Sequence, residues 1–383
     1  MSQVPSLLPL EPPDDDFCRR LPKIELHAHL SGSITRPCLQ RIWEARKGED
    51  PDFDVPEPRL ALADHSVGQG INEFFAHFNT YLYRILSTPS SLSVATHSVL
   101  TEFQADGVVY LELRTTPRAL PPTAHTQGLT AEGAVRLILS VIKDWNTSSS
   151  PMHASLILTI DRIKHSPAQA MEIVDLALRL RDEGLPVVGV DLAGDCNTPR
   201  DMAPLRPAYA HAQAANLPIT VHFAEVPNSA SESELRELLT WNPRRLGHAI
   251  HVPEAMRRLI VDRGIAVELC LTCNVLARML PSQHEEHEPG FVDHHFAWWW
   301  AEDCSLSLGT DDMGVFGSPS SQEYRLAAEH FALSRTDLVS LCRRAMRGAF
   351  SGLETRDHVE AALEAFESRE GLGQPRPHSE NPP

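Results

Sequence analysis

Apolar stretches alternate with amphipathic stretches along most of the chain. Eight short apolar runs have the length and composition of β-strands, and they predict strands over 23–29, 108–114, 153–161, 187–194, 218–225, 245–250, 265–273 and 305–311. Between these runs, apolar residues recur at the spacing of one helix face. This spacing predicts helices over 71–82, 131–144, 167–183, 200–215, 253–263 and 318–332.

Strands that alternate with helices favour a parallel sheet, and eight such units predict an α/β fold of the (β/α)8 TIM-barrel type. A doubly wound sheet is the alternative. The barrel is favoured because nearly every apolar run ends in residues able to do chemistry, and TIM barrels collect their active sites at the C-terminal ends of the strands. The long segment after the first strand, which includes 47–66, is predicted to be a helical insertion that forms a lid or pocket wall.

The two ends of the chain differ in composition from the rest. Residues 1–17 look irregular, and 371–383 are polar and rich in proline. We therefore predict an irregular N-terminal segment over 1–17, a single (β/α)8 domain over 18–370, and a disordered tail over 371–383. An α/β barrel can occupy this length as one unit.

Composition narrows the class of partner. A formal net charge of −17 disfavours nucleic acid as a binding partner, because the phosphate backbone binds to basic protein surfaces. No apolar run approaches the roughly 20 residues needed to cross a bilayer, and the first residues lack the basic start of a signal peptide. The seven cysteines, an odd number, lie scattered in apolar segments and indicate reduced thiols. We expect a cytoplasmic monomer that binds a small molecule, and neither nucleic acid nor membrane.

Four residues at three strand ends form a candidate metal site. His27 and His29, in "KIELHAHLSGSI", would point to one face of the first strand about 7 Å apart. His222 ends the fifth strand and Asp311 ends the eighth. Three imidazoles and a carboxylate suit one Zn²⁺ with a position left for water. Taken alone, His222 has the alternative of a core histidine, and Asp311 that of a turn or helix cap.

A metal-bound water has a pKa of about 7 in place of 15.7, so hydroxide becomes available at neutral pH. Proton transfer still needs a partner. Glu225 follows His222 in "VHFAE", near the metal but not on it, and we predict that it is the general acid and base. Its pKa would have to be raised by burial or by Asp312. The alternative is that Glu225 is the first residue of a helix.

Three further residues at strand ends are candidates for the same site. His248 ends the sixth strand, where it could orient the hydroxide and offset charge on the attacked centre. His251 is the competing choice, although it falls in an expected loop. Asp312 would contact the substrate or the hydroxide. Gly194, in "DLAGD", would let a ligand approach a backbone N–H closely because it has no Cβ.

Five segments, in this order, resemble the adenosine/AMP deaminase family: "KIELHAHLSGSI", "DLAGD", "VHFAE", "RLGH" and "SLGTDDMGVF". The resemblance runs from about Leu21 to Phe350. It implies a zinc-dependent (β/α)8 barrel that hydrolyses the 6-amino group of a purine. It also implies one zinc per chain on His27, His29, His222 and Asp311, protonation of purine N1 by Glu225, steering of the hydroxide by His248 and Asp312, and contact of Gly194 with the base.

The branch of the family is suggested by position 31. Adenosine deaminases proper carry an Asp there, which contacts the ribose hydroxyl and would repel a 5′-phosphate, whereas Ser31 is neutral. The segment "VVYLELRTTPR" resembles the branch that acts on N6-methyl-AMP, giving IMP and methylamine. That branch usually carries Asn at position 31. The resemblance then implies that the substrate-binding residues are His29, Ser31, Thr115, Thr116, Pro117, Arg118, Asp161, Gly194 and Asp312.

Alternatives to this function are an adenosine deaminase and a non-catalytic purine nucleotide-binding barrel. A two-metal amidohydrolase commonly needs a bridging lysine after the fourth strand, and "LAGD" has none. Besides Ser31, which is neither Asn nor Asp, two residues depart from the family pattern: Ala249 stands where Gly is usual, and Cys273 where Ser is usual.

Other motifs are predicted to be structural. "CLTC" at 270–273 has no second pair of cysteines, so we interpret it as core. We interpret "HEEHE" at 284–288 as a solvated loop. "FAWWWAED" at 296–303 is interpreted as a helix in the core, with one tryptophan able to reach a subunit interface.

Overall fold

In the computed structural model, which describes residues 13–61, 81–282 and 288–372, eight parallel strands hydrogen-bond in chain order as one sheet. They are β1 (Lys23–His29), β2 (Val108–Thr115), β3 (His153–Asp161), β4 (Val187–Ala193), β5 (Ile219–Phe223), β6 (Arg245–His248), β7 (Ala266–Leu269) and β8 (Leu306–Leu308). The chain just after β8 closes the sheet, because the N–H of Asp311 donates to the carbonyl of His27 and the N–H of His29 donates to the carbonyl of Asp311, each at 2.8 Å. The predicted (β/α)8 barrel is confirmed.

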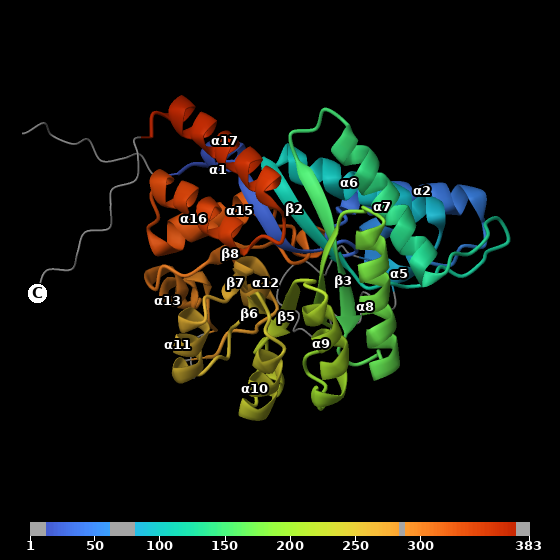
Figure 1. Ribbon diagram of the computed structural model, residues 1–383. Helices are drawn as coiled ribbons and strands as arrows, with labels where there is room; N and C mark the ends of the chain where they lie inside the picture. Colours follow the sequence, from blue (N-terminus) through green and yellow to red (C-terminus); the bar gives the residue numbers. More distant parts are fainter. Residues whose placement is uncertain (1–12, 62–80, 283–287, 373–383) are drawn as a thin grey trace, which may run out of the picture.

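Helices surround the strands (Figure 1). Those described are α1 (Asp15–Arg20), α2 (Arg36–Glu49), α3 (Pro58–Ala61), α5 (Tyr83–Ile85), α6 (Pro89–Ala105), α7 (Ala131–Thr147), α8 (Pro167–Asp182), α9 (Arg206–Ala214), α10 (Glu232–Thr240), α11 (Glu254–Asp262), α12 (Leu271–Leu276), α13 (Phe296–Ala301), α14 (Met313–Phe316), α15 (Ser320–Phe331), α16 (Arg335–Gly348) and α17 (Leu353–Glu370), with 3₁₀ turns η2 (Ala203–Leu205), η3 (Pro227–Ser229) and η4 (Phe291–Asp293). In the described ranges, none of these helices has both the length and the apolar content to cross a membrane.

The segment between β1 and β2 is the predicted helical insertion, because it contains α2, α3, α5 and α6. The predicted helix over 71–82 falls almost wholly outside the described residues, as do most of "HEEHE" and the two ends of the chain. Helix α1 begins at Asp15, so the last residues of the segment predicted to be irregular are helical. The side chain of Asp14 accepts from the N–H of Phe17 at 2.7 Å and starts that helix.

Helix starts follow from local sequence. The hydroxyl of Thr130 accepts from the N–H of Gly133 at 3.0 Å and caps α7. Ser166 and Gln169 form a capping box before α8, and Pro167 occupies its first turn. Both helices begin at the predicted residues because these signals lie within a few residues of one another in the sequence.

The predicted strand over 265–273 is too long. Strand β7 ends at Leu269, and Leu271–Leu276 form α12. A continuous apolar run does not distinguish a buried strand from a buried helix. The predicted strands over 218–225, 245–250 and 305–311 are also too long, because β5, β6 and β8 end at Phe223, His248 and Leu308. Positive φ values at Ala224, His248, Ala249 and Asp311, outside the β region, bend the chain at these strand ends. These bends carry the site residues over the mouth of the barrel.

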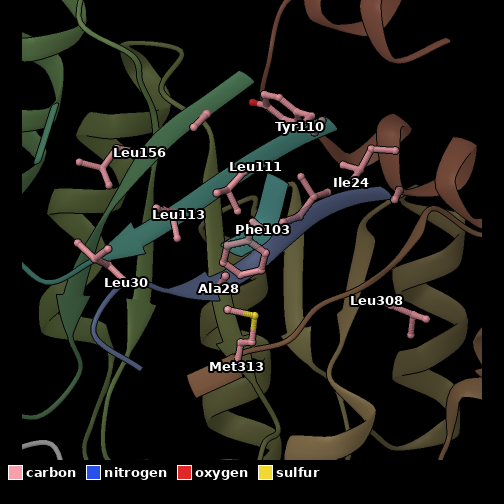
Figure 2. Packing of buried hydrophobic residues seen from close by; sticks show 14 of the residues in the cluster. Ile24, Ala28, Leu30, Phe103, Tyr110, Leu111, Leu113, Leu156, Leu308 and Met313 are labelled. Carbon is pink, nitrogen blue, oxygen red and sulfur yellow. The ribbon is translucent and has the colours of Figure 1, made fainter. Parts of the chain in front are cut away.

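An apolar layer lies between the strands and the helices. Figure 2 shows part of it, where β1 and β2 contribute Ile24, Ala28, Leu111 and Leu113. Helix α13 belongs to this layer through Phe296 and Trp299, which are fully buried, so the core interpretation of "FAWWWAED" is confirmed.

The barrel interior is polar. The strands also carry buried side chains that are charged or hydrogen-bonding, among them Glu112, Arg114, Asp191, Thr220, Arg245 and Glu268. Ion pairs join strands that are not neighbours: Arg114 of β2 lies 2.9 Å from Glu268 of β7, and Arg245 of β6 lies 2.6 Å from Glu112 of β2. Such contacts are made only across the interior. Buried ions are tolerated there because each has a partner of opposite charge.

Candidate active site

Five predicted residues meet at the C-terminal end of the barrel. His27 and His29 come from β1, His222 from β5 and His248 from the end of β6, and Asp311 follows β8. One ligand atom from each of His27, His222, His248 and Asp311 lies within 4.8 Å of the others. The Nε2 atom of His29 lies 3.2 Å from both Asp311 Oδ1 and His222 Nε2. We call these five residues the histidine–aspartate cluster.

His27 is held by a carboxylate at its far nitrogen. Its Nδ1 lies 2.6 Å from Glu268 Oε2, which can only accept, so Nδ1 carries a proton. Its Nε2 has no hydrogen-bond partner among the described residues, although the side chain is fully buried. A buried nitrogen of this kind, anchored from behind, is the usual arrangement of a metal-binding imidazole.

His222 is oriented in the same way. Its Nδ1 lies 2.9 Å from the carbonyl oxygen of Leu192 and 3.2 Å from Asp191 Oδ1, both acceptors. Nδ1 is therefore protonated, and Nε2 presents its lone pair to the cluster. The donor set of imidazole nitrogens and one carboxylate oxygen fits a first-row metal such as zinc.

Burial and charge set the protonation of the cluster. Burial lowers the pKa of His29 to about 4, which leaves the imidazole neutral. Burial also lowers the pKa of His27, but the carboxylates of Glu268 and Asp311 outweigh it and raise the pKa to about 9. Metal binding would displace the resulting proton, because only the neutral imidazole is a ligand.

Glu225 lies just past β5 and faces the cluster. It is buried, and its Oε1 lies 3.8 Å from His248 Nε2. Burial, reinforced by the charge of Asp311, holds the pKa of Glu225 above its ordinary value. A raised pKa makes the carboxyl hold its proton more tightly, which suits a general acid.

Asp312 stands next to Asp311 but in a different state. Burial and the charges of Asp311 and Glu225 hold the pKa of Asp312 well above its ordinary value. Asp312 precedes α14, yet its side chain makes no capping hydrogen bond. Gly32 leaves the room for it, because a Cβ on Gly32 would fall 1.5 Å from Asp312 Oδ1. The carboxyl group of Asp312 therefore does not cap α14 and is available to contact a ligand.

A pocket beside β2 collects the residues predicted to border the nucleotide. Its lining includes Ser31 and Thr115, Thr116, Pro117 and Arg118. The Arg118 guanidinium lies over the ring of Tyr83, with Cζ 3.1 Å from the ring centroid. Tyr83 comes from the insertion, and Leu86 and Leu92, also of the insertion, line the pocket, so the insertion contributes to its wall.

Asp161 and Gly194 lie against each other and are not part of that pocket lining. Asp161 Oδ1 accepts from the N–H groups of Ile163 and Lys164, at 2.9 and 2.8 Å. Gly194 has φ +115°, and a Cβ there would lie 2.9 Å from Asp161 Oδ1.

His251, the alternative to His248, points away from the cluster, because its Nε2 donates to the carbonyl of Met279 at 2.8 Å.

Several site residues were missed by sequence reasoning. Glu268 and Asp191 anchor the two histidines described above, and Tyr83 stacks on Arg118. Cys273, predicted to be core, is buried but its thiol also donates to Asp311 Oδ2 at 2.8 Å. The available signal for Glu268 was a lone acidic residue inside an apolar strand, which needs a buried partner.

The sequence profile described as "Adenosine deaminase" matches residues 22–365, which is most of the chain. The chain belongs to the adenosine deaminase family. It is therefore a hydrolytic deaminase acting on a purine C–N bond.

Relatives within the adenosine deaminase family include proteins of known activity. The human N6-Methyl-AMP deaminase is 33% identical over 357 residues, which cover 91% of this chain and 94% of the human protein. The N6-mAMP deaminase of Arabidopsis thaliana is 32% identical over 364 residues, which cover 90% of this chain and 96% of the Arabidopsis protein. The crystal structure of Arabidopsis ADAL complexed with IMP superposes with a TM-score of 0.78 at 28% identity, covering 93% of this chain and 99% of that chain.

Proposed function

We propose that this protein is a zinc-dependent deaminase that converts N6-methyl-AMP and water to IMP and methylamine. The observation that carries the proposal is the buried histidine–aspartate cluster with Glu225 beside it, in a chain about one-third identical to N6-methyl-AMP deaminases. We further propose one zinc per chain, a single catalytic domain over 18–370, and action as a monomer. All seven cysteines are free thiols, which supports a reducing compartment such as the cytoplasm.

His27, His29, His222 and Asp311 would hold the zinc. His222 presents its Nε2 lone pair, His27 Nε2 would become a ligand once the metal displaces its proton, and His29 Nε2 is within 3.2 Å of Asp311 and His222. A zinc ion bound there would lower the pKa of a coordinated water to about 7 and so supply the nucleophile.

Glu225 would hold the proton that the purine needs. Donation of this proton to N1 draws electrons from C6 and makes C6 open to attack by water oxygen. A C6–O bond then forms and the C6–N6 bond breaks. Of the two protons of the water, one goes to the leaving nitrogen, which departs as methylamine, and the other restores the proton of Glu225. Glu225 suits this task because burial keeps its carboxyl protonated closer to neutral pH.

Asp312 and Gly194 would position the base. Asp312 is buried beside Asp311, and its Oδ1 has no hydrogen-bond partner in the part of the chain that the structure describes; Gly194 leaves its backbone open to close approach. His248 would contribute a hydrogen bond at the reacting centre.

The pocket of Ser31 and Arg118 supports a nucleotide over a nucleoside. Ser31 brings no negative charge against a 5′-phosphate, and Thr115 and Thr116 bring hydroxyl donors to the same pocket. Arg118 adds a permanent positive charge with a planar set of donors that matches phosphate. The adenosine deaminase alternative has less support, because that activity favours a carboxylate at position 31. Asp161 remains a predicted neighbour of the nucleotide.

The test compares N6-methyl-AMP, AMP and adenosine as substrates of the purified protein, with zinc content measured on the same sample. We expect the highest kcat/KM for N6-methyl-AMP, one zinc per chain, and loss of turnover on chelation that added zinc reverses. Turnover of adenosine alone would overturn the assignment of N6-methyl-AMP as the substrate. Tight binding of IMP without turnover of any substrate would favour the non-catalytic barrel.

A further inference from the structure

Asn274 and His294 form a hydrogen-bond relay behind His248. Asn274 lies in α12, and its Nδ2 is 3.0 Å from His248 Nδ1. On its other side, Asn274 Oδ1 is 3.0 Å from His294 Nε2. His294 precedes α13, and its Nδ1 is 3.0 Å from the backbone nitrogen of Phe296. The three side chains are almost fully buried, so no water competes for these bonds.

The direction of the relay is set at its far end. A backbone N–H can only donate, so His294 Nδ1 must accept from Phe296 and carries no proton. The proton of neutral His294 is then on Nε2, which donates to Asn274 Oδ1. Asn274 turns its NH₂ group to His248, whose Nδ1 must accept. The proton of His248 is therefore on Nε2, which faces Glu225 and Asp311 at 3.8 and 4.0 Å.

The backbone of His248 is held by the next residue along. His295 Nε2 lies 2.7 Å from the carbonyl oxygen of His248, so the segment before α13 supports both the backbone and, through Asn274, the ring. The backbone of His248 has φ +62°, a strained conformation for a residue with a side chain. A strained residue persists only where its surroundings over-determine it.

We propose that Asn274 and His294 are positioning residues that fix His248 as a hydrogen-bond donor at Nε2. The proposal deepens the proposed deaminase function and rests on it. A ring with a proton on Nε2 has no lone pair there, so His248 cannot serve as a fourth ligand in place of His29 even though its Nε2 is close enough. It donates to the oxygen that becomes bonded to C6.

The first test reads the tautomer directly. Protein labelled with ¹⁵N-histidine and loaded with zinc is examined by NMR, and the His248 ring signals are assigned by their loss in His248→Asn. We expect a protonated Nε2 and a bare Nδ1. A protonated Nδ1 on His248 would overturn the proposal. This readout needs no turnover, so it separates failure of the relay from failure of the deaminase function.

The second test reverses the donor. Asn274→Asp keeps the shape but offers His248 only acceptors, so the His248 proton should move to Nδ1. We expect kcat to fall by about 10²–10³-fold, as when one donor to a developing oxyanion is removed, with KM changed by less than about twofold and zinc content unchanged. Asn146→Asp is the matched control, because Asn146 also uses both amide atoms, with Ala154, on α7.

The third test uses the far end of the relay. His294→Leu removes the donor to Asn274 and should lower kcat at least tenfold, whereas His294→Gln keeps an N–H donor and should restore most of it. Equal kcat in the two variants would contradict the relay. If His294→Leu fails to fold, His294→Gln tests the relay on its own, with its histidine NMR spectrum compared with that of the wild type. A folded His294→Gln that keeps the Nε2 proton on His248 but loses activity would also contradict the relay.

Discussion

The chemistry of the site depends on how individual carboxyl groups are treated. Glu225 and Asp312 are buried near the negative charge of Asp311, and both pKa values are raised. For Asp311 the neighbouring imidazoles of His27 and His29 outweigh burial and lower its pKa. The three carboxyl groups of one site thus differ: the lowered pKa of Asp311 suits a metal ligand, whereas the raised pKa values of Glu225 and Asp312 suit groups that hold a proton.

Glu225→Gln tests the proton role. The amide keeps the size of the side chain but cannot donate an acidic proton, so we predict a kcat lowered by about 10²–10⁴-fold. Zinc content should stay at the wild-type level because Glu225 is not a ligand. Steady-state kinetics on N6-methyl-AMP and metal analysis check both parts. An unchanged kcat would remove Glu225 as the acid.

Ser31→Asp tests the basis of nucleotide preference. A carboxylate in the pocket with Arg118 would neutralise that cation and repel the phosphate, so the ratio of kcat/KM for AMP over adenosine should fall by about tenfold or more. Ser31→Asn is the control, because it adds similar bulk without charge and should keep the ratio. The repulsion argument fails if aspartate and asparagine give the same ratio.

The elements of this barrel were predictable where their signals are local. Strand β1 and the starts of α7 and α8 agree with the sequence pattern because alternation, Thr130 and Ser166 act within a few residues. The split of one apolar run into β7 and α12 was not predictable, since both elements are buried. The cluster was predictable because strand ends meet at one edge, but Glu268 was not, because its partners lie across the barrel.

Thr130→Ala tests a local signal at the scale of one helix. Loss of the hydroxyl leaves the N–H of Gly133 without its partner, and the free energy of unfolding should fall by about 1 kcal/mol. Ser140→Ala, at an exposed position on the same helix, is the control and should not destabilise, because alanine has the higher helix propensity. Urea titrations of the two variants give the comparison.

At the scale of the whole molecule, the polar interior links the mouth of the barrel to its floor. Glu268 contacts His27, Arg114 and Arg245, and Arg245 reaches Glu112 and the carbonyl of Gly348. Each charge in this set is buried with at least one opposite charge. The set is stable only as a whole, because an unpaired buried ion costs far more than a pair.

Arg245→Met tests this dependence. It would leave Glu112 without its ion-pair partner and Glu268 with one fewer, so we predict a loss of about 3–5 kcal/mol in the free energy of unfolding. The double variant with Glu112→Gln should recover part of that loss by removing the stranded charge. Denaturant midpoints measure both. A single variant as stable as wild type would show that the interior charges are not coupled.

The sharing of Glu268 between His27 and two arginines bears on protein engineering. Transplanting the cluster into a barrel filled with aliphatic side chains would bring the imidazoles without the anion that orients the first of them. A successful graft would have to import the arginine and glutamate layers beneath as well. The portable unit of this enzyme is thus a column running down the barrel axis, not a ring of residues at its rim.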